Sequence, residues 1–141
     1  PLMDPDARAS FTGLSLRHSK AHLIRAVMEG VVFSLRQGYE IMERLGVETD
    51  QITLSGGGTR HALWQQLVSD IFNKRIRVSD NPEASARGAA ILAAAGAGVY
   101  GSVTEASNRL ADVEGRIVLP NPKNVQLYDR IFGSYCDLMT K

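Results

Sequence analysis

The sequence has few of the features that mark secreted, membrane-spanning or nucleic-acid-binding proteins. Its single cysteine, Cys136, cannot form a disulfide within the chain, which favours a reducing compartment and predicts a cytoplasmic protein. No apolar run approaches the roughly 18 residues that a membrane-spanning helix needs. The 16 lysines and arginines nearly balance 15 aspartates and glutamates. The resulting net charge of +1 therefore predicts no nucleic-acid partner and no membrane surface.

The composition is that of a core-forming globular chain. Hydrophobic residues make up 44% of the 141 residues and charged residues 22%, proportions that suit one folded domain. The chain opens at Pro1, and its first residues resemble the interior of a protein. We therefore expect it to be a piece of a longer protein.

Hydrophobic periodicity predicts strands that alternate with helices. Ser19 is placed to cap a helix that Gly46 ends, and the first 18 residues predict a loop with a short extended piece at 11–16. Two strands are too few for a stable sheet, so we expect further strands upstream of Pro1 or from a second chain. The alternation predicts an α/β fold. The expected helices are 20–45, 59–72, 83–96 and 124–139, the strands are 51–55 and 75–79, and 101–121 is a connection with one short helix at 103–110.

Two packing expectations follow from this pattern. Glycine inside a helix costs about 1 kcal/mol relative to alanine, so Gly30 and Gly38 predict a neighbour packed closely against the first helix. The helix at 59–72 is expected to direct four apolar side chains inward. They are Leu63, Leu67, Ile71 and Phe72.

The stretch ITLSGGGTR, residues 52–60, places three glycines between a strand and a helix. The glycines could simply form a tight turn, or they could let a ligand approach bare backbone beyond the carboxyl end of the strand. The stretch lacks the third glycine of a dinucleotide-binding G-x-G-x-x-G motif and the GK[ST] of a P-loop. The residues alone leave the turn and the ligand site as alternatives.

Other candidate sites are weaker. His18 and His22 have the four-residue spacing of some metal ligands, but no third ligand accompanies them, so capping or solvent exposure is the simpler interpretation. Cys136 lies on an amphipathic helix and is interpreted as a packing residue. No pair of carboxylates suggests an acid/base couple. We therefore assign no catalytic residue and no metal ligand.

A longer pattern runs through the first third of the chain. Its positions are Ala9, Phe11, Gly13–Leu14, His22–Leu23 and Ala26–Val27–Met28–Glu29. This pattern resembles the C-terminal signature of the FGGY carbohydrate kinases. Three further blocks are similar to that family, so the resemblance covers nearly the whole chain: LSGGGTRHALWQQLVSDIFNKRIRV, EASARGAAILAAAGAGVY and LPNPKNVQLYDRIFGSYCDL.

This resemblance implies a protein with two domains of the actin-like ATPase, or ribonuclease H-like, fold. ATP and a sugar would bind between the domains, and the γ-phosphoryl group of ATP would pass to a sugar hydroxyl with help from Mg²⁺ and an aspartate base. Residues 1–141 would be the C-terminal portion of the nucleotide-binding C-terminal domain. Upstream strands, the N-terminal sugar domain and the base would lie outside this chain.

The resemblance also implies residue roles and a substrate. The backbone of Gly56, Gly57 and Gly58 would lie against adenosine and the phosphates, and His61 would lie beside the adenine. Within the family the chain is most like the xylulokinases. This likeness implies conversion of D-xylulose to D-xylulose 5-phosphate, and the resemblance also implies a homodimer. Glu29, Gly30 and Gly88 belong to the family pattern and are interpreted as packing residues.

A second function class stays open. The chain could belong to a non-catalytic module of the same fold that binds nucleotide or only a partner, since no base or sugar-binding residue is recognised in it.

Overall fold

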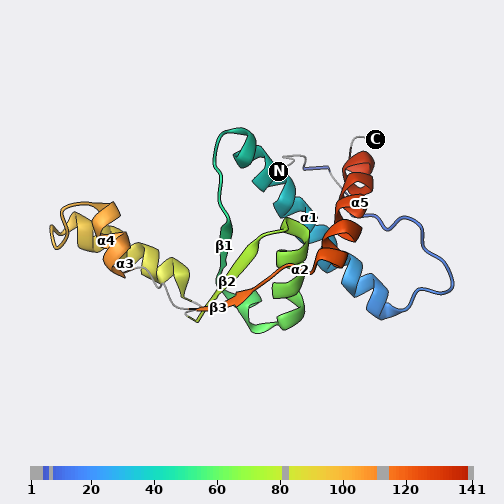
Figure 1. Cartoon of the computed structure of the whole chain (residues 1–141), viewed down its shortest axis with the longest axis horizontal. Helices are drawn as coiled ribbons and strands as arrows, with labels where there is room; N and C mark the ends of the chain where they lie inside the picture. The colour runs from blue at the N-terminus through green and yellow to red at the C-terminus, as the bar shows by residue number, and fades with distance from the viewer. Residues whose placement is uncertain (1–4, 7, 81–82, 111–114, 140–141) are drawn as a thin grey trace. The chain divides into compact units, whose positions relative to one another are not determined.

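The computed structural model describes residues 5–6, 8–80, 83–110 and 115–139, which form two compact units. The first unit draws on Pro1–Thr49, Asp70–Asn73 and Asn121–Lys141, and the second on Asp50–Ser69 and Lys74–Pro120. Both units are seen in Figure 1. The chain is mixed α/β, with a small sheet and a C-terminal helix, as the sequence predicts.

The first unit is built on two helices that contact each other, α1 (Lys20–Arg44) and α5 (Pro122–Met139) (Figure 1). Phe33 of α1 is buried and contacts an aromatic stripe on α5. The ring centroids of that stripe lie 5.4–6.0 Å from that of Phe33, a separation typical of favourable aromatic pairs. The stripe comprises Tyr128, Phe132 and Tyr135.

Helix α1 begins and ends where the sequence predicts. Ser19 is its N-cap, and the imidazole Nδ1 of His22 lies 3.1 Å from the backbone nitrogen of Ser19. This confirms that His22 serves as a capping residue. Gly46 follows the helix with a φ of +87°, the left-handed conformation that commonly ends helices.

Many apolar residues of α1 are exposed in the described structure. α5 packs against Phe33 of α1, and Val32 and Phe33 are the buried residues of this helix. No described atom lies within 4 Å of a Cβ placed on Gly30 or Gly38, so the expected close neighbour at these glycines was wrong. The exposed apolar residues are Ile24, Val27, Val31, Leu35, Ile41 and Met42.

A polar triad also joins the two helices of the first unit. The Arg25 guanidinium donates to the Tyr128 hydroxyl at 2.6 Å and to the Glu29 carboxylate at 2.7 Å. The Tyr128 hydroxyl in turn donates to Glu29 at 2.8 Å. Burial raises the pKa of Tyr128, and the Glu29 carboxylate raises it further, while Arg25 opposes them. The neutral phenol is therefore the form that suits the folded state.

This triad predicts a loss of stability at alkaline pH. The pKa of Tyr128 is higher in the folded than in the unfolded protein, so its contribution is complete below about pH 10 and is lost as pH rises further. Tyr128→Phe should lower the free energy of unfolding by about 1 kcal/mol at neutral pH. The same variant should also flatten the decline above pH 10. Urea denaturation from pH 7 to 11 measures both effects.

Tyr135→Phe is the matched control. Burial raises the pKa of Tyr135 too. Removing the Tyr135 hydroxyl should therefore also reduce the loss of unfolding free energy at alkaline pH, but it should leave the Arg25–Glu29 pair intact. An alkaline decline in Tyr128→Phe as steep as that of the unchanged protein would contradict the assignment.

A buried carboxylate near the end of α2 (Ala62–Phe72) holds the start of α5. Asp70 is 2% exposed. One of its oxygens accepts from the backbone nitrogen of Asn121, and the other accepts from the amide nitrogen of Asn124, both at 2.7 Å. Asn121 itself caps α5, because its side-chain oxygen accepts from the backbone nitrogen of Lys123 at 3.0 Å.

The second unit is organised around a sheet with the strand order β1-β2-β3 (Figure 1). β1 and β2 are parallel and pair Ile52 with Ile76, whereas β2 and β3 are antiparallel and pair Ile76 with Val118. Ile76 is therefore central to the sheet and fully buried. The remaining elements of this unit are β1 (Gln51–Leu54), a 3₁₀ turn η1 (Gly57–Arg60), β2 (Arg75–Ser79), α3 (Ala84–Gly96), α4 (Val103–Leu110) and β3 (Gly115–Val118).

The third strand differs from the sequence prediction, which treated this stretch as a connection. β3 opens with Gly115, whose φ is +154°. A Cβ at this position would lie 2.4 Å from the carbonyl oxygen of Val78, so the close approach of β3 to β2 requires glycine. Glycine disfavours strands by propensity, yet Gly115 is the residue that allows β3 to pair with β2.

Helix α2 packs through only part of its predicted apolar face. Leu67 is 1% exposed, as expected, but Leu63 is 47% exposed, so that inward assignment was wrong. The hydroxyl of Ser69 links the helix to the sheet by donating to the carbonyl oxygen of Val118 at 3.3 Å. None of the described helices has the length and apolar character needed to cross a lipid bilayer.

Candidate functional site

The glycine stretch lies where the sequence predicts, directly after the carboxyl end of β1. Because β1 and β2 are parallel, Leu54 pairs with Val78 and both strands end at the same edge of the sheet. That edge is where open α/β sheets bind ligands. The helix expected to start at residue 59 is preceded by the 3₁₀ turn η1 and begins instead at Ala62.

Gly56 is needed for its backbone conformation. Its φ of +79° and ψ of −161° fall in a region that only glycine populates readily. Thr59 fixes this conformation from the other side of the turn, because its backbone nitrogen and its hydroxyl both donate to the Gly56 carbonyl oxygen, at 3.1 and 2.8 Å. The first glycine therefore has an intramolecular explanation.

Gly58 is needed for the packing of Trp64. A Cβ on Gly58 would lie 2.6 Å from the indole Nε1 and 2.8 Å from Cδ1. Any side chain at this position would therefore displace the tryptophan or the turn. The third glycine also has an intramolecular explanation.

Gly57 has neither explanation. Its φ is not positive, and a Cβ at this position would meet no described atom within 4 Å. The residue is exposed on the turn. Nothing within the described part of the chain requires glycine here, which favours the alternative that the bare backbone accommodates something outside the chain.

His61 lies at the junction between η1 and α2. It is exposed, its backbone nitrogen donates to Gly58, and its carbonyl oxygen accepts from Gln65 at 3.1 Å. The imidazole is thus carried on a hydrogen-bonded piece of backbone three residues from Gly58.

Gln65 is a part of the site that the sequence analysis did not find. It is 3% exposed, and its amide nitrogen donates to the carbonyl oxygen of Thr59 at 2.6 Å. Its amide oxygen accepts from the guanidinium of Arg116 on β3. The sequence offers no signal for this role beyond a polar residue in an amphipathic helix, and the partner Arg116 could not be seen without β3.

The remaining candidates from the sequence do not join this site. The rings of His18 and His22 lie near each other on the first unit, with centroids 5.6 Å apart. Among residues 5–6, 8–80, 83–110 and 115–139, no group of three or more His, Cys, Asp or Glu side chains could hold a metal ion. Cys136 is half-buried and lies 3.7 Å from the amide nitrogen of Gln37, consistent with a packing role.

Comparison with known proteins decides the family. Residues 1–97 match the model of the FGGY family of carbohydrate kinases, C-terminal domain. The chain belongs to the FGGY family of carbohydrate kinases. The xylulose kinase of Staphylococcus epidermidis is 38% identical over 135 residues, which cover 96% of this chain and 27% of that protein. The chain thus spans about a quarter of the length of this FGGY relative.

Solved structures of FGGY kinases share the fold. The ligand-bound xylulose kinase of Lactobacillus acidophilus matches with a TM-score of 0.82 and 28% identity, over 95% of this chain and 27% of that one. The glycerol kinase of Plasmodium falciparum with ADP matches with a TM-score of 0.70 and 26% identity, over 94% of this chain and 27% of that one. These likenesses confirm the α/β fold class expected from the sequence.

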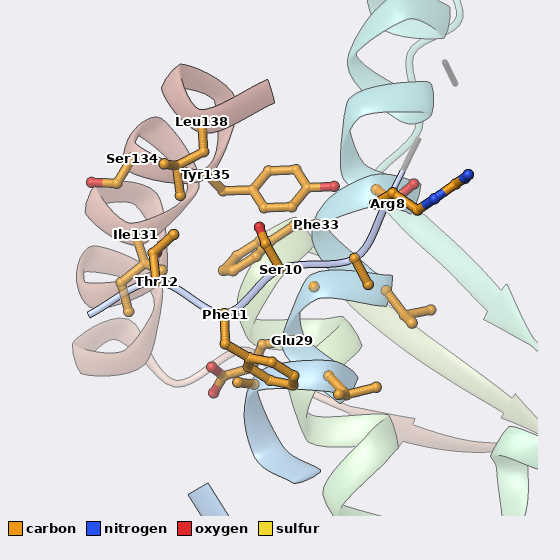
Figure 2. A pocket seen from close by; sticks show the side chains of 16 residues that line it. Arg8, Ser10, Phe11, Thr12, Glu29, Phe33, Ile131, Ser134, Tyr135 and Leu138 are labelled. Carbon is orange, nitrogen blue, oxygen red and sulfur yellow. The ribbon is translucent and has the colours of Figure 1, made fainter. Parts of the chain in front are cut away.

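Part of the FGGY signature lines a groove in the first unit, between the segment 8–12, α1 and α5 (Figure 2). Phe11 and Glu29 both line this groove, and Tyr135 lines it from α5. The Glu29 carboxylate is already held by Arg25 and Tyr128. This is the packing role expected of the acidic signature residue.

Gly88, the other residue interpreted as packing, has no such role in the described structure. No described atom lies within 4 Å of a Cβ placed on it.

Proposed function

We propose that this chain is the nucleotide-binding part of a sugar kinase that transfers the γ-phosphoryl group of ATP to a carbohydrate hydroxyl. The observation that carries the proposal is the open backbone at Gly57, at the strand edge where α/β folds bind ligands. Membership of the FGGY family supplies the reaction class. A relative of this fold was solved with ADP, which supports a nucleotide as the ligand.

In this proposal the chain contributes binding and positioning. The backbone of Gly56, Gly57 and Gly58 lies against adenosine and the phosphates, and the exposed His61 lies beside the adenine. Phosphoryl transfer depends chiefly on positioning and on stabilisation of charge. No aspartate of this chain matches the base motif of the family, so we assign nucleotide binding to the chain and place the aspartate base elsewhere in the full-length protein.

Mg²⁺ is expected with ATP in this reaction class. The described residues offer no cluster of acidic or imidazole side chains that fits a metal ion. We therefore assign no ligand for Mg²⁺ in this chain and derive no step through it.

D-xylulose is the sugar we propose, with D-xylulose 5-phosphate as the product. The name of the Staphylococcus epidermidis relative, at 38% identity, supports this choice. The resemblance to a glycerol kinase shows that closely similar C-terminal folds accompany different substrates. The contacts that select the sugar are accordingly placed in the N-terminal domain of the full-length protein.

The direct test is an assay of the full-length protein with ATP and a panel of acceptors: D-xylulose, D-ribulose, D-gluconate and glycerol. ADP release that depends on acceptor, with the highest kcat/KM for D-xylulose, is the expected result. Preference for another sugar would overturn the substrate but leave the kinase. ATP binding without turnover of any acceptor would favour the non-catalytic module.

A cytoplasmic location and a homodimer complete the proposal. Both come from the sequence, through the single cysteine and the family resemblance. Light scattering of the full-length protein measures the oligomeric state directly.

A further inference from the structure

The buried amide of Gln65 ties the glycine turn to the opposite edge of the sheet. Its nitrogen donates to the Thr59 carbonyl oxygen at 2.6 Å, and its oxygen accepts from Arg116 on β3. Thr59 holds the Gly56 carbonyl oxygen through its own hydroxyl at 2.8 Å. A continuous chain of hydrogen bonds therefore runs from β3 to the first glycine of the turn.

The orientation of this amide is fixed by its two partners. A backbone carbonyl can only accept and a guanidinium can only donate. The Gln65 nitrogen must therefore face Thr59, and its oxygen must face Arg116. Because the side chain is 3% exposed, water cannot replace a lost hydrogen bond without rearrangement.

We propose that Gln65 is a positioning residue for the nucleotide, acting through the glycine turn. This inference rests on the proposed function. By fixing Thr59, Gln65 keeps Gly56 in its glycine-only conformation and thereby sets where the bare backbone of Gly57 meets the ligand. Gln65 contacts no nucleotide itself, so its loss should weaken nucleotide binding without changing contacts to the sugar.

The sharpest test is Gln65→Glu in the full-length protein. A carboxylate keeps the acceptor for Arg116 and can form a charge-assisted pair with it. It cannot donate to Thr59 and places an oxygen against that carbonyl. We expect the KM for ATP and the Kd for ADP to rise about tenfold, with the KM for the sugar unchanged. Steady-state kinetics and ADP calorimetry provide the two readouts.

Two controls separate positioning from stability. Arg116→Met leaves the buried Gln65 oxygen without its donor but keeps the hydrogen bond to Thr59, so it should lower the melting temperature with little change in the KM for ATP. Gln66→Glu makes the same chemical change one residue along, where the amide donates to the Leu119 carbonyl oxygen at 3.1 Å rather than to the turn. It should leave the KM for ATP unchanged.

If Gln65→Glu does not fold, Thr59→Val tests the same chain of hydrogen bonds. Valine removes the hydroxyl that holds the Gly56 carbonyl oxygen, and the KM for ATP should rise severalfold. An unchanged KM for ATP in a folded Gln65→Glu variant, or in Thr59→Val, would overturn the positioning role. A full-length protein that binds no ADP and turns over no acceptor before any substitution would instead overturn the proposed function, which keeps the two failures distinct.

Discussion

A Gly57→Val variant should keep its fold and lose at least about 90% of its nucleotide affinity, which corresponds to roughly 1.4 kcal/mol or more of binding free energy. Gly57 is the one glycine of the turn with no intramolecular reason for its identity. Its φ is not positive, and a Cβ there meets no described atom within 4 Å. A branched side chain should therefore be tolerated by the protein but collide with a ligand lying on the backbone.

Calorimetric titration of the full-length protein with ADP measures this effect, and thermal denaturation shows whether the fold is kept. Gly57→Ala should give a smaller loss of affinity, since it adds only one carbon. Gly58→Ala is the contrasting control, because its Cβ would lie 2.6 Å from the indole nitrogen of Trp64 and should lower the melting temperature. Unchanged ADP affinity in a folded Gly57→Val variant would mean that the three glycines serve the turn alone.

The position of the glycine turn could be predicted from the sequence, but the different roles of its glycines could not. A strand followed by three glycines and an amphipathic helix is a local pattern, and local patterns are visible in one sequence. The requirement for Gly58 comes from the side chain of Trp64, six residues away. Only the structure shows that Gly57 is free of such a requirement.

The hydrogen bonds that hold the glycine turn include one between residues distant in the sequence. The Gln65 amide oxygen accepts from Arg116, which lies 51 residues further along the chain on a strand that periodicity did not reveal. β3 was missed because Gly115 is a strand breaker by propensity. Its role depends on the approach of Val78, which one sequence cannot show. The sequence therefore predicted the elements that follow a repeating pattern and missed those fixed by a contact.

The long helix α1 also combines features that the sequence predicts with a feature that depends on a contact. Its bounds followed from Ser19 and Gly46, which act on neighbouring residues. Its buried side did not follow from periodicity, because Phe33 is buried by contact with the aromatic residues of α5. Periodicity identifies which residues share a face of a helix, whereas the partner determines which face is covered in the described structure.

A large loss of stability is expected when Asp70 is replaced. Asp70→Ala should lower the free energy of unfolding by about 3 kcal/mol, because it removes two hydrogen bonds to a buried charged acceptor. The backbone nitrogen of Asn121 and the amide of Asn124 would both lose their 2.7 Å contacts. The start of α5 would then no longer be held to the end of α2. Such a loss is a large fraction of the stability of an ordinary domain.

Asp129→Ala is the matched control for this prediction. It also removes a carboxylate with a 2.7 Å charged contact, to Arg36, but the Asp129 side chain is 51% exposed. Exposed ion pairs contribute no more than about 1 kcal/mol, so urea denaturation should separate the two variants clearly. Equal losses in both would mean that burial does not set the contribution of Asp70.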